Sequence, residues 1–382
     1  MSHCDHRELA PGERRPFADD AVTRRPRAAI IGLGQIGNQF DDDPKRTAVW
    51  THAGAYAAIP EIALMAGADP DSDRLSRFLE RRGVAAGYRD YQDMLCCETI
   101  DLLSVCSPTA LHHEMVLAGV KAGVRAIFCE KPLAATVAQA AEMVEVCEAA
   151  GVLLAVNHTR RWEDIYRRAQ RLLEQGAIGH LESLVGYYPG KVFTMGTHLF
   201  DLMRYFAGDV EWVCGQAVGH GDEANLSGHL GFRSGVQGSI VCGWERANHI
   251  FEVDLLGCRG RLRLSGDGAK MELFRFEDSP RYSGYTELAG AIDGAPGSGG
   301  PVHEENRLIA AVRDIVRCLA DGGTPACVGA DGAAAVEIAW ALCESATRGS
   351  TRIELPATTG PSTRLRTGPS TRLTTGRRER SC

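Results

Sequence analysis

The stretch Ala28-Ala29-Ile30-Ile31-Gly32-Leu33-Gly34-Gln35-Ile36-Gly37 decides the fold of the first half of this chain. Its four leading apolar residues are typical of a buried strand, and the glycines that follow have the spacing G-x-G-x-x-G. In such a turn the first glycine permits a tight bend, the second lets a pyrophosphate approach the backbone, and the third lets the next helix pack on the strand. Glycines also form ordinary structural turns, but the strand before them and the helix-forming sequence after them favour a dinucleotide site formed by Gly32, Gly34, Gln35, Ile36 and Gly37.

The same order of strand, turn and helix recurs as far as Asn157. Predicted strands cover residues 28–31, 62–68, 87–88, 101–106, 126–129 and 153–157, and predicted helices cover 72–82, 91–96, 110–122 and 137–150. Strands and helices that alternate at this spacing indicate parallel βαβ units. We therefore expect an α/β Rossmann domain over residues 27–158.

The pattern changes after Trp162. Predicted helices at 163–175 and 197–206 flank a strand at 181–186, and short strands joined by glycine-containing turns then run from 210 to 276. Such strands are typical of antiparallel sheet. A long loop at 278–301 is followed by helices at 304–320 and 332–346 and a strand at 353–355. We expect a second, α+β domain over residues 159–355, with one large, mostly antiparallel open sheet.

Neither end of the chain has the composition of a folded segment. Residues 1–26 carry several charges and no apolar segment of the kind that a secretory signal needs, which predicts a disordered cytoplasmic leader. The segment TGPSTRL begins at Thr359 and again at Thr367, within a tail rich in proline, glycine, serine, threonine and arginine. We predict that residues 356–382 form a disordered tail, and a basic interaction tail is the sharper alternative.

The overall composition excludes several classes of protein. The 382 residues are 44% hydrophobic and 24% charged, as in soluble globular proteins, and a net charge of −7 disfavours a nucleic-acid partner. The longest run without Asp, Glu, Lys or Arg is 47–60, which is shorter than the roughly 20 residues of a membrane span. The 13 cysteines include no C-x-x-C pair, so we expect reduced, buried thiols and no metal site, while the pair Cys96-Cys97 leaves a redox role open.

Asp69 ends the second predicted strand, where an acidic side chain normally binds the adenosine ribose and repels a 2′-phosphate. It lies unusually far from the glycines, because the stretch from about Phe40 to Trp50 has the character of an inserted loop. Asp69 therefore favours NAD over NADP. The alternative is that Asp69 only caps the following helix, with Pro70 at its start, which would leave the preference open.

Lys131 is the strongest candidate for chemistry. It is one of only five lysines, and it follows a predicted strand of the parallel sheet in the order Glu130-Lys131-Pro132. Ligands of open α/β sheets bind at the carboxyl ends of strands. Lysine can hydrogen-bond a reacting hydroxyl or carbonyl group, whereas a salt-bridged surface lysine is the plainer alternative.

Three motifs together resemble one family. The glycine turn, Glu130-Lys131-Pro132 and Gly196-Thr197-His198-Leu199-Phe200-Asp201 occur in the order found in the Gfo/Idh/MocA family, the group of glucose-fructose oxidoreductase and inositol dehydrogenase. Further matching stretches are Ser107-Pro108-Thr109-Ala110-Leu111-His112 and Asn157-His158-Thr159-Arg160-Arg161-Trp162. The resemblance runs from about Arg27 to Leu355.

The resemblance implies hydride transfer between a carbinol carbon of a sugar, cyclitol or sugar derivative and C4 of nicotinamide. By the same resemblance Lys131 orients the substrate hydroxyl, His198 accepts its proton, and Asp201 is a candidate to orient the imidazole. The cofactor-binding set that follows adds Asp69, Ser107, Pro108, Thr109, His112, Glu130, Lys131 and Asn157 to the glycine turn. The candidate substrate-binding set is Lys131, Arg161, Lys191, Thr194, Thr197 and His198.

One position departs from the family pattern. Many dehydrogenases of the family have an aspartate four residues before the histidine, and this chain has Thr194 there. Threonine donates and accepts hydrogen bonds but takes no proton at neutral pH. Proton transfer then depends on His198 and Lys131, while Lys191 is a candidate to bind a phosphate or carboxylate of the substrate.

Three functions remain open at this point. The leading hypothesis is an NAD-dependent sugar or cyclitol dehydrogenase; the others are an enzyme that retains NAD and uses transient oxidation for elimination or glycosidic cleavage, and a non-catalytic NAD-binding regulator. An open sheet with one uncovered face also predicts a homodimer or homotetramer formed through that face. We expect a cytoplasmic protein with a small-molecule partner and neither a nucleic-acid nor a membrane partner.

Overall fold

The computed structural model describes residues 25–219, 225–243, 249–290 and 305–356. The chain divides into two compact units, which we treat separately: residues 1–157 with 306–329, and residues 158–305 with 330–382. The predicted leader before residue 25 and the predicted basic tail after residue 356 lie outside the described residues. Among the described helices, none combines the length and the apolar composition that crossing a membrane requires.

The first unit contains a six-stranded sheet in the order β3-β2-β1-β4-β5-β6, and every pair of neighbours is parallel. Its strands are β1 (Arg27–Ile31), β2 (Ala63–Ala68), β3 (Ala86–Tyr88), β4 (Leu102–Val105), β5 (Ala126–Cys129) and β6 (Leu153–Val156). Its helices are α1 (His52–Ala57), α2 (Ser72–Arg82), α3 (Tyr91–Cys97), α4 (Thr109–Lys121), α5 (Val137–Ala150) and α8 (Arg307–Asp321). This is the predicted Rossmann order, in which the strand sequence reverses between β1 and β4.

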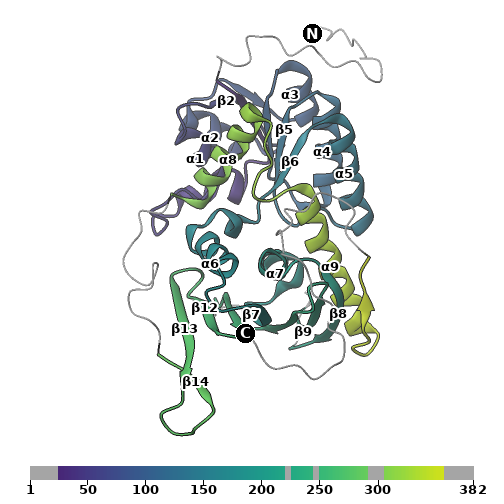
Figure 1. Ribbon diagram of the computed structural model, residues 1–382. Helices are drawn as coiled ribbons and strands as arrows, with labels where there is room; N and C mark the ends of the chain where they lie inside the picture. The colour runs from purple at the N-terminus through teal and green to yellow at the C-terminus, as the bar shows by residue number, and fades with distance from the viewer. Residues whose placement is uncertain (1–24, 220–224, 244–248, 291–304, 357–382) are drawn as a thin grey trace. The chain divides into compact units, whose positions relative to one another are not determined.

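Burial explains why the central strands are continuously apolar. Every residue of β4 and β5 is buried, because helices cover both faces of the sheet. Figure 1 shows α4 and α5 together on one side of the sheet and α1, α2 and α8 on the other. Asp71 caps the start of α2, and Gly83 ends that helix in the left-handed conformation, so both boundaries agree with the sequence prediction.

The second unit contains a nine-stranded sheet in the order β14-β13-β12-β11-β7-β10-β9-β8-β15, in which only the pair β7 and β10 is parallel among the described strands. Its strands are β7 (Leu181–Tyr188), β8 (Val210–Ala217), β9 (Leu226–Phe232), β10 (Gln237–Cys242), β11 (Glu252–Gly257), β12 (Gly260–Ser265), β13 (Lys270–Asp278), β14 (Thr286–Leu288) and β15 (Ile353–Glu354). Its helices are α6 (Asp164–Glu174), α7 (Thr197–Ala207) and α9 (Gly329–Thr347), the last of which begins at the boundary between the units.

Among the described residues, helices cover one face of this sheet. Residues of β11 and β12 alternate between buried and half-buried, as expected when one face packs on helices. Two glycines permit the close packing: a side chain at Gly186 of β7 would overlap Leu199 of α7, and one at Gly215 of β8 would overlap the backbone of Leu342 in α9. The predicted α+β architecture with a large open sheet is confirmed.

Three details differ from the sequence prediction. The glycine turn opens a five-residue π-helical turn, Gln35–Gln39, and a short 3-10 turn, Phe40–Asp42, before α1 begins at His52, because the inserted loop interrupts the helix. The short strand β14 lies within the predicted loop 278–301, of which residues 291–304 are outside the described part. Helix α8 belongs to the first unit, although its position in the sequence suggested the second.

Candidate active site

The three glycines of the first turn differ in what surrounds them. Gly32 has φ +88°, and a Cβ there would lie 2.7 Å from the backbone of Cys106 and Ser107. A Cβ at Gly37 would lie 2.0 Å from the carbonyl oxygen of Gly32. At Gly34 the nearest atom to a Cβ would be Arg74 Nη1, 3.9 Å away. The first and third glycines are thus required by the fold, while the second faces open space where a ligand can approach the backbone.

Asp69 follows β2 and is buried, with both carboxylate oxygens bonded to backbone. Leu33 N–H donates to Oδ2 over 2.8 Å, and Asp71 N–H donates to Oδ1 over 2.9 Å. The helix cap of α2 is Asp71, whose carboxylate accepts from the N–H groups of Asp73 and Arg74, so the alternative that Asp69 caps this helix is wrong. Asp69 instead holds the glycine turn, and each oxygen retains a lone pair for a ribose hydroxyl.

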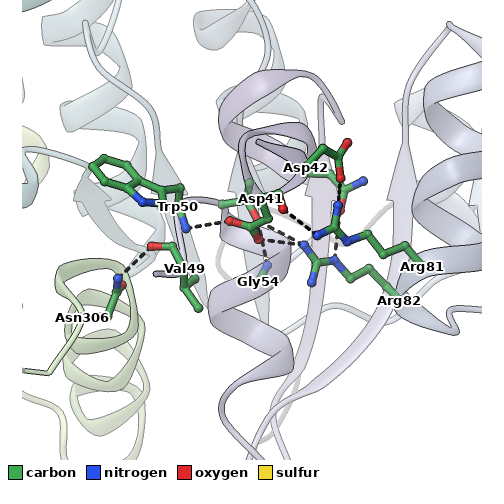
Figure 2. Close-up of polar contacts among 10 residues, drawn as sticks. Asp41, Asp42, Val49, Trp50, Gly54, Arg81, Arg82 and Asn306 are labelled. Atoms are coloured by element: carbon green, nitrogen blue, oxygen red, sulfur yellow. Dashed lines mark hydrogen bonds and ion pairs between the residues drawn. The ribbon is translucent and has the colours of Figure 1, made fainter. Parts of the chain in front are cut away.

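Asp41 anchors the inserted loop between the glycine turn and α1 (Figure 2). Its carboxylate accepts hydrogen bonds from Trp50 N–H over 2.7 Å, from Thr51 Oγ1 over 2.5 Å and from Arg82 Nη2 over 2.9 Å. Thr51 in turn caps α1 by accepting from Gly54 N–H. The loop is therefore tied to the first turn of α1 and to the end of α2.

The loop is held at two further points (Figure 2). Arg81 donates to the Asp41 carbonyl oxygen over 2.9 Å and forms an ion pair with Asp42. Asn306, which caps α8, donates from Nδ2 to the carbonyl oxygen of Val49 over 2.7 Å. The insertion that the sequence predicted between Phe40 and Trp50 is thus an ordered segment of the first unit.

Two buried polar atoms at the carboxyl ends of strands lack hydrogen-bond partners among the described residues. They are the hydroxyl oxygen of Ser107, after β4, and the amide oxygen of Asn157, after β6. A buried polar atom without a partner costs about 1–3 kcal/mol, so a ligand that supplies the partner is stabilised there. Both residues belong to the predicted cofactor set.

The loops after β4 and β5 are joined by His112 of α4. Its Nε2 lies 2.8 Å from the carbonyl oxygen of Ser107, and its Nδ1 lies 3.0 Å from that of Pro132. Pro108 caps α4, and Thr109 is its first residue. His112 therefore holds these loops together, and direct contact of Pro108, Thr109 or His112 with a cofactor stays a prediction.

Glu130 and Lys131 follow β5, and the Lys131–Pro132 peptide is cis. Glu130 is buried, and its Oε1 accepts from Asn157 Nδ2 over 2.5 Å and lies 3.0 Å from His52 Nε2. Its Oε2 accepts from the backbone N–H of Lys131 over 3.3 Å. Burial by itself raises the pKa of Glu130, but the hydrogen bond and charge of His52, the charge of Lys131 and the Asn157 bond together lower it.

In the second unit, the π-helical turn Lys191–Gly196 leads directly into α7, which carries the motif Gly196-Thr197-His198 near its start. Thr197 and His198 are buried, and the Thr197 hydroxyl donates to the carbonyl oxygen of Phe193 over 3.0 Å. The ring centroid of His198 lies 5.5 Å from that of His158.

Asp201, one turn after His198, is held by Arg161. Arg161 Nε lies 2.9 Å from Asp201 Oδ2, and Arg161 Nη2 lies 2.7 Å from Asp201 Oδ1 and 3.1 Å from Asp331. His158 Nδ1 is 3.5 Å from the Asp201 carboxylate. Burial alone raises the pKa of Asp201, but Arg161 and His158 lower it well below its usual range. Arg161 thus holds α7 in place through Asp201. Two further roles stay predictions: a direct bond from Arg161 to the substrate, and orientation of His198 by Asp201.

Lys191 and Thr194 lie in the turn before α7. Lys191 has φ +60°, and its backbone N–H donates to Asn225 Oδ1 over 2.8 Å. A Cβ at the preceding Gly190 would lie 2.5 Å from the same Asn225 oxygen, so glycine is required there. Thr194 is exposed and Lys191 is half-buried, and contact of either side chain with a substrate stays a prediction.

Sequence reasoning missed four residues of this arrangement. His52, Ser104 and Tyr56 form a buried polar chain with Glu130, and Asp331 completes the ion pairs of Arg161. His52 lies in the longest run without acidic or basic residues, and a single polar ring in such a run was the available signal.

Comparison with known proteins agrees with both units. The model of an oxidoreductase family with an NAD-binding Rossmann fold matches residues 26–158, and the model of the GFO/IDH/MocA C-terminal domain matches residues 188–263. The chain belongs to this family. It is therefore an oxidoreductase with an NAD-binding domain, as the glycine turn and the Glu130-Lys131-Pro132 motif predicted.

Similar proteins of this family include named dehydrogenases. D-apiose dehydrogenase of Paraburkholderia graminis is 28% identical over 91% of this chain and 96% of its own length. Myo-inositol 2-dehydrogenase of Thermotoga maritima is 30% identical over 62% of this chain and 74% of its own length.

Solved structures of the same fold are more distant in sequence. Levoglucosan dehydrogenase in complex with NADH and L-sorbose is 20% identical with a TM-score of 0.71, covering 87% of this chain and 99% of its own. Scyllo-inositol dehydrogenase of Lactobacillus casei, with bound NAD(H) and scyllo-inositol, is 18% identical with a TM-score of 0.68, covering 87% of this chain and 99% of its own. At this identity the similarity establishes the fold.

The residues of the first unit fit NAD. The open space at Gly34, the buried Asp69 carboxylate and the unpartnered Ser107 hydroxyl lie around the β1 and β4 strand ends, where a Rossmann sheet binds a dinucleotide. The backbone of the glycine turn and of the π-helical turn after it would hold the pyrophosphate of NAD.

Proposed function

We propose that this oxidoreductase oxidises a secondary hydroxyl of a sugar, cyclitol or sugar derivative with NAD. The observation that carries the proposal is Lys131, which stands at the carboxyl end of β5 beside a buried, ionised Glu130 in a sheet with a dinucleotide turn. The named activities of relatives on D-apiose and myo-inositol support this substrate class.

The proposed roles follow from the chemistry of each side chain. NAD, when bound, accepts the hydride from the carbinol carbon at C4 of its nicotinamide. Lys131, as an ammonium, donates a hydrogen bond to the hydroxyl oxygen and stabilises the negative charge that develops there. His198 accepts the hydroxyl proton at an imidazole nitrogen, because histidine is the side chain best suited to act as a general base near neutral pH.

Thr194 bears on which residue accepts the hydroxyl proton. A threonine hydroxyl hydrogen-bonds to a sugar hydroxyl but takes no proton, so the proposal gives proton acceptance to His198 alone. Thr194, Thr197 and Arg161 are proposed to contact the substrate, and Lys191 to bind an anionic group on it. If Lys191→Ala retains activity with an unchanged KM, its role in substrate binding is excluded.

We also propose that the uncovered face of the second unit's sheet joins copies of this chain, in a dimer or tetramer. Val185, Tyr187 and Val241 are neighbours on that face, and Val241 is 42% exposed. Ion pairs of Arg263 with Glu252 and of Arg261 with Asp254 flank them. Sedimentation of wild type and Val241→Glu tests this: loss of the oligomer in the variant supports this face as the interface, and an unchanged oligomer excludes it.

A cytoplasmic location stays a prediction from composition.

The decisive experiment is a panel of pentoses, hexoses, glycosides and inositols, assayed by reduction of NAD and of NADP. Net NADH with one substrate is expected, and Lys131→Ala and His198→Ala should each lower kcat by about 10²–10⁴-fold with little change in NAD affinity. A redox-neutral reaction with retained NAD identifies the eliminating or bond-cleaving enzyme instead. NAD binding without turnover of any substrate identifies a regulator.

A further inference from the structure

A buried chain of polar side chains connects α1 to the residue before Lys131. Tyr56 OH lies 2.6 Å from Ser104 Oγ, Ser104 Oγ lies 2.8 Å from His52 Nδ1, and His52 Nε2 lies 3.0 Å from Glu130 Oε1. His52 and Ser104 are fully buried and Tyr56 is 1% exposed. Four side chains from α1, β4 and the end of β5 therefore form one path that ends on a carboxylate.

The direction of the hydrogen bonds follows from the donors available. An ionised carboxylate only accepts, so His52 Nε2 carries a hydrogen and donates to Glu130. In a neutral ring, Nδ1 then accepts from the Ser104 hydroxyl, and the Ser104 oxygen accepts from Tyr56. Each of these polar atoms has its partner in this arrangement. A charged ring would donate from both nitrogens, and Ser104 would then donate to Tyr56 OH, which reverses the last bond of the chain.

Other groups beside Glu130 bear on its charge. Asn157 donates to the same oxygen that His52 reaches, and among the described residues the thiols of Cys106 and Cys129 lie within the influence of the carboxylate. Burial and the charge of Glu130 raise the pKa of both thiols well above the ordinary value, so they are neutral. Lys131 is the cation beside Glu130, and its charge is among the influences that favour the ionised carboxylate.

We propose that His52 is a positioning residue for the reaction: by donating to Glu130, it holds a fixed negative charge beside Lys131 and so keeps the Lys131 ammonium protonated and oriented. The role in turnover rests on the proposed function of Lys131. The anchored loop supports the assignment, because Asp41 binds the Thr51 hydroxyl and Thr51 caps α1, which sets His52 as the first residue of that helix.

The test measures the titration of Lys131 directly. Reductive ¹³C-dimethylation of the full chain labels the five lysines, few enough to resolve by NMR, and Lys131→Arg identifies the Lys131 signal. Glu130→Gln keeps the shape of the side chain and an amide oxygen that can accept from His52 and Asn157, but it loses the acceptor of the Lys131 N–H and removes the negative charge. The pKa of Lys131 is expected to fall by about one unit or more in this variant, because a neighbouring negative charge favours the ammonium.

In His52→Ala the pKa of Lys131 should fall by less than it does in Glu130→Gln. The titration curve of the Lys131 signal should also show an inflection from Glu130, at a higher pH than in wild type. The matched control is His113→Ala, since His113 lies 2.8 Å from Glu142 in a surface pair outside this chain of contacts, and Lys131 should titrate there as in wild type. If His52→Ala does not fold, Ser104→Ala is measured in its place. Ser104→Ala removes the hydroxyl that donates to His52 Nδ1, and the pKa of Lys131 is again expected to fall.

If Lys131 titrates as in wild type in Glu130→Gln and in each folded variant of the chain, the proposal is overturned. Where a substrate is oxidised, the alkaline limb of kcat should move to lower pH in Glu130→Gln by the same amount as the Lys131 signal. A shifted Lys131 signal without oxidation of any polyol would refute the proposed function and leave the coupling of His52, Glu130 and Lys131 standing.

Discussion

Gly34 and Gly37 lie three residues apart in one motif but are glycines for different reasons. Gly34 has φ −72° and ψ −150°, which alanine also adopts, and no atom of the described chain lies within 3.8 Å of where its Cβ would stand, the nearest being 3.9 Å away. At Gly37 the corresponding Cβ would overlap the carbonyl oxygen of Gly32 at 2.0 Å. The packing of the described residues explains Gly37 and gives no reason for Gly34, where we predict that a ligand approaches the backbone.

Alanine substitutions at Gly34 and at Gly37 test separately whether each glycine serves a ligand or the packing of the fold. Gly34→Ala should melt at the wild-type temperature yet bind NAD about tenfold more weakly or worse, a loss of at least ~1.4 kcal/mol. Gly37→Ala should lose about 1–3 kcal/mol of stability through overpacking. Thermal unfolding and titration calorimetry with NAD measure both. Wild-type NAD affinity in Gly34→Ala would show that the open space beside Gly34 is not the path of the pyrophosphate.

Among the elements, the inserted loop has several of its anchoring contacts on one side chain. Asp41 receives the Trp50 N–H, the Thr51 hydroxyl and Arg82 Nη2, and these come from the far end of the loop, the cap of α1 and the end of α2. Within the loop, Arg46 Cζ lies 3.9 Å from the ring centroid of Phe40 and 4.9 Å from that of Trp50, so cation–π contacts add to the polar anchoring.

Asp41→Ala should therefore release the loop. We expect a loss of about 1–3 kcal/mol, because three donors lose their acceptor, together with faster hydrogen exchange over residues 43–51. Asp43→Ala is the matched control: Asp43 is exposed and pairs with Arg46 at 3.4 Å three residues away, so the cost should be at most about 1 kcal/mol. Equal exchange rates in the two variants would contradict the anchoring role of Asp41.

For the molecule as a whole, buried carboxylates set the response to acid. The pKa values of Asp201, in the second unit, and Glu130, in the first, are both lower in the folded protein than ordinary values. A carboxyl with a depressed folded pKa contributes stability that is fully present above its unfolded pKa of about 4, and that contribution is lost as pH falls through the folded value.

The free energy of unfolding should accordingly fall below about pH 4, by up to about 1.4 kcal/mol per pH unit for each such group. Asp201→Asn should cost about 3–5 kcal/mol at pH 7, because it removes one of the two carboxylates that neutralise the buried Arg161, and should flatten this acid dependence. Urea titrations between pH 3 and pH 7 test it. Asp164→Asn is the control, because Asp164 pairs with Arg171 at 3.6 Å on the surface, and its loss should cost under about 1 kcal/mol. If wild type, Asp201→Asn and Asp164→Asn lose stability equally on acidification, Asp201 is excluded as a source of the acid dependence.

Much of the candidate site could be predicted from the sequence, because its motifs lie in short, continuous stretches of the chain. The glycine spacing, the apolar runs that became β1, β4 and β5, and the order Glu130-Lys131-Pro132 are each contained in a few consecutive residues. Strand and helix periodicities depend on neighbours along the chain, so they predicted the Rossmann order, the NAD-binding domain and the open second sheet.

The tertiary structure alone decided which distant residues act together. His52 and Glu130 are 78 positions apart, and α8 joins the first unit after strands β7 to β14 of the second sheet have intervened. Arg161, predicted as a substrate ligand, meets Asp201 and Asp331 in buried ion pairs. Such contacts depend on how loops return the chain and on which buried donors find acceptors, and neither leaves a periodic pattern in the sequence.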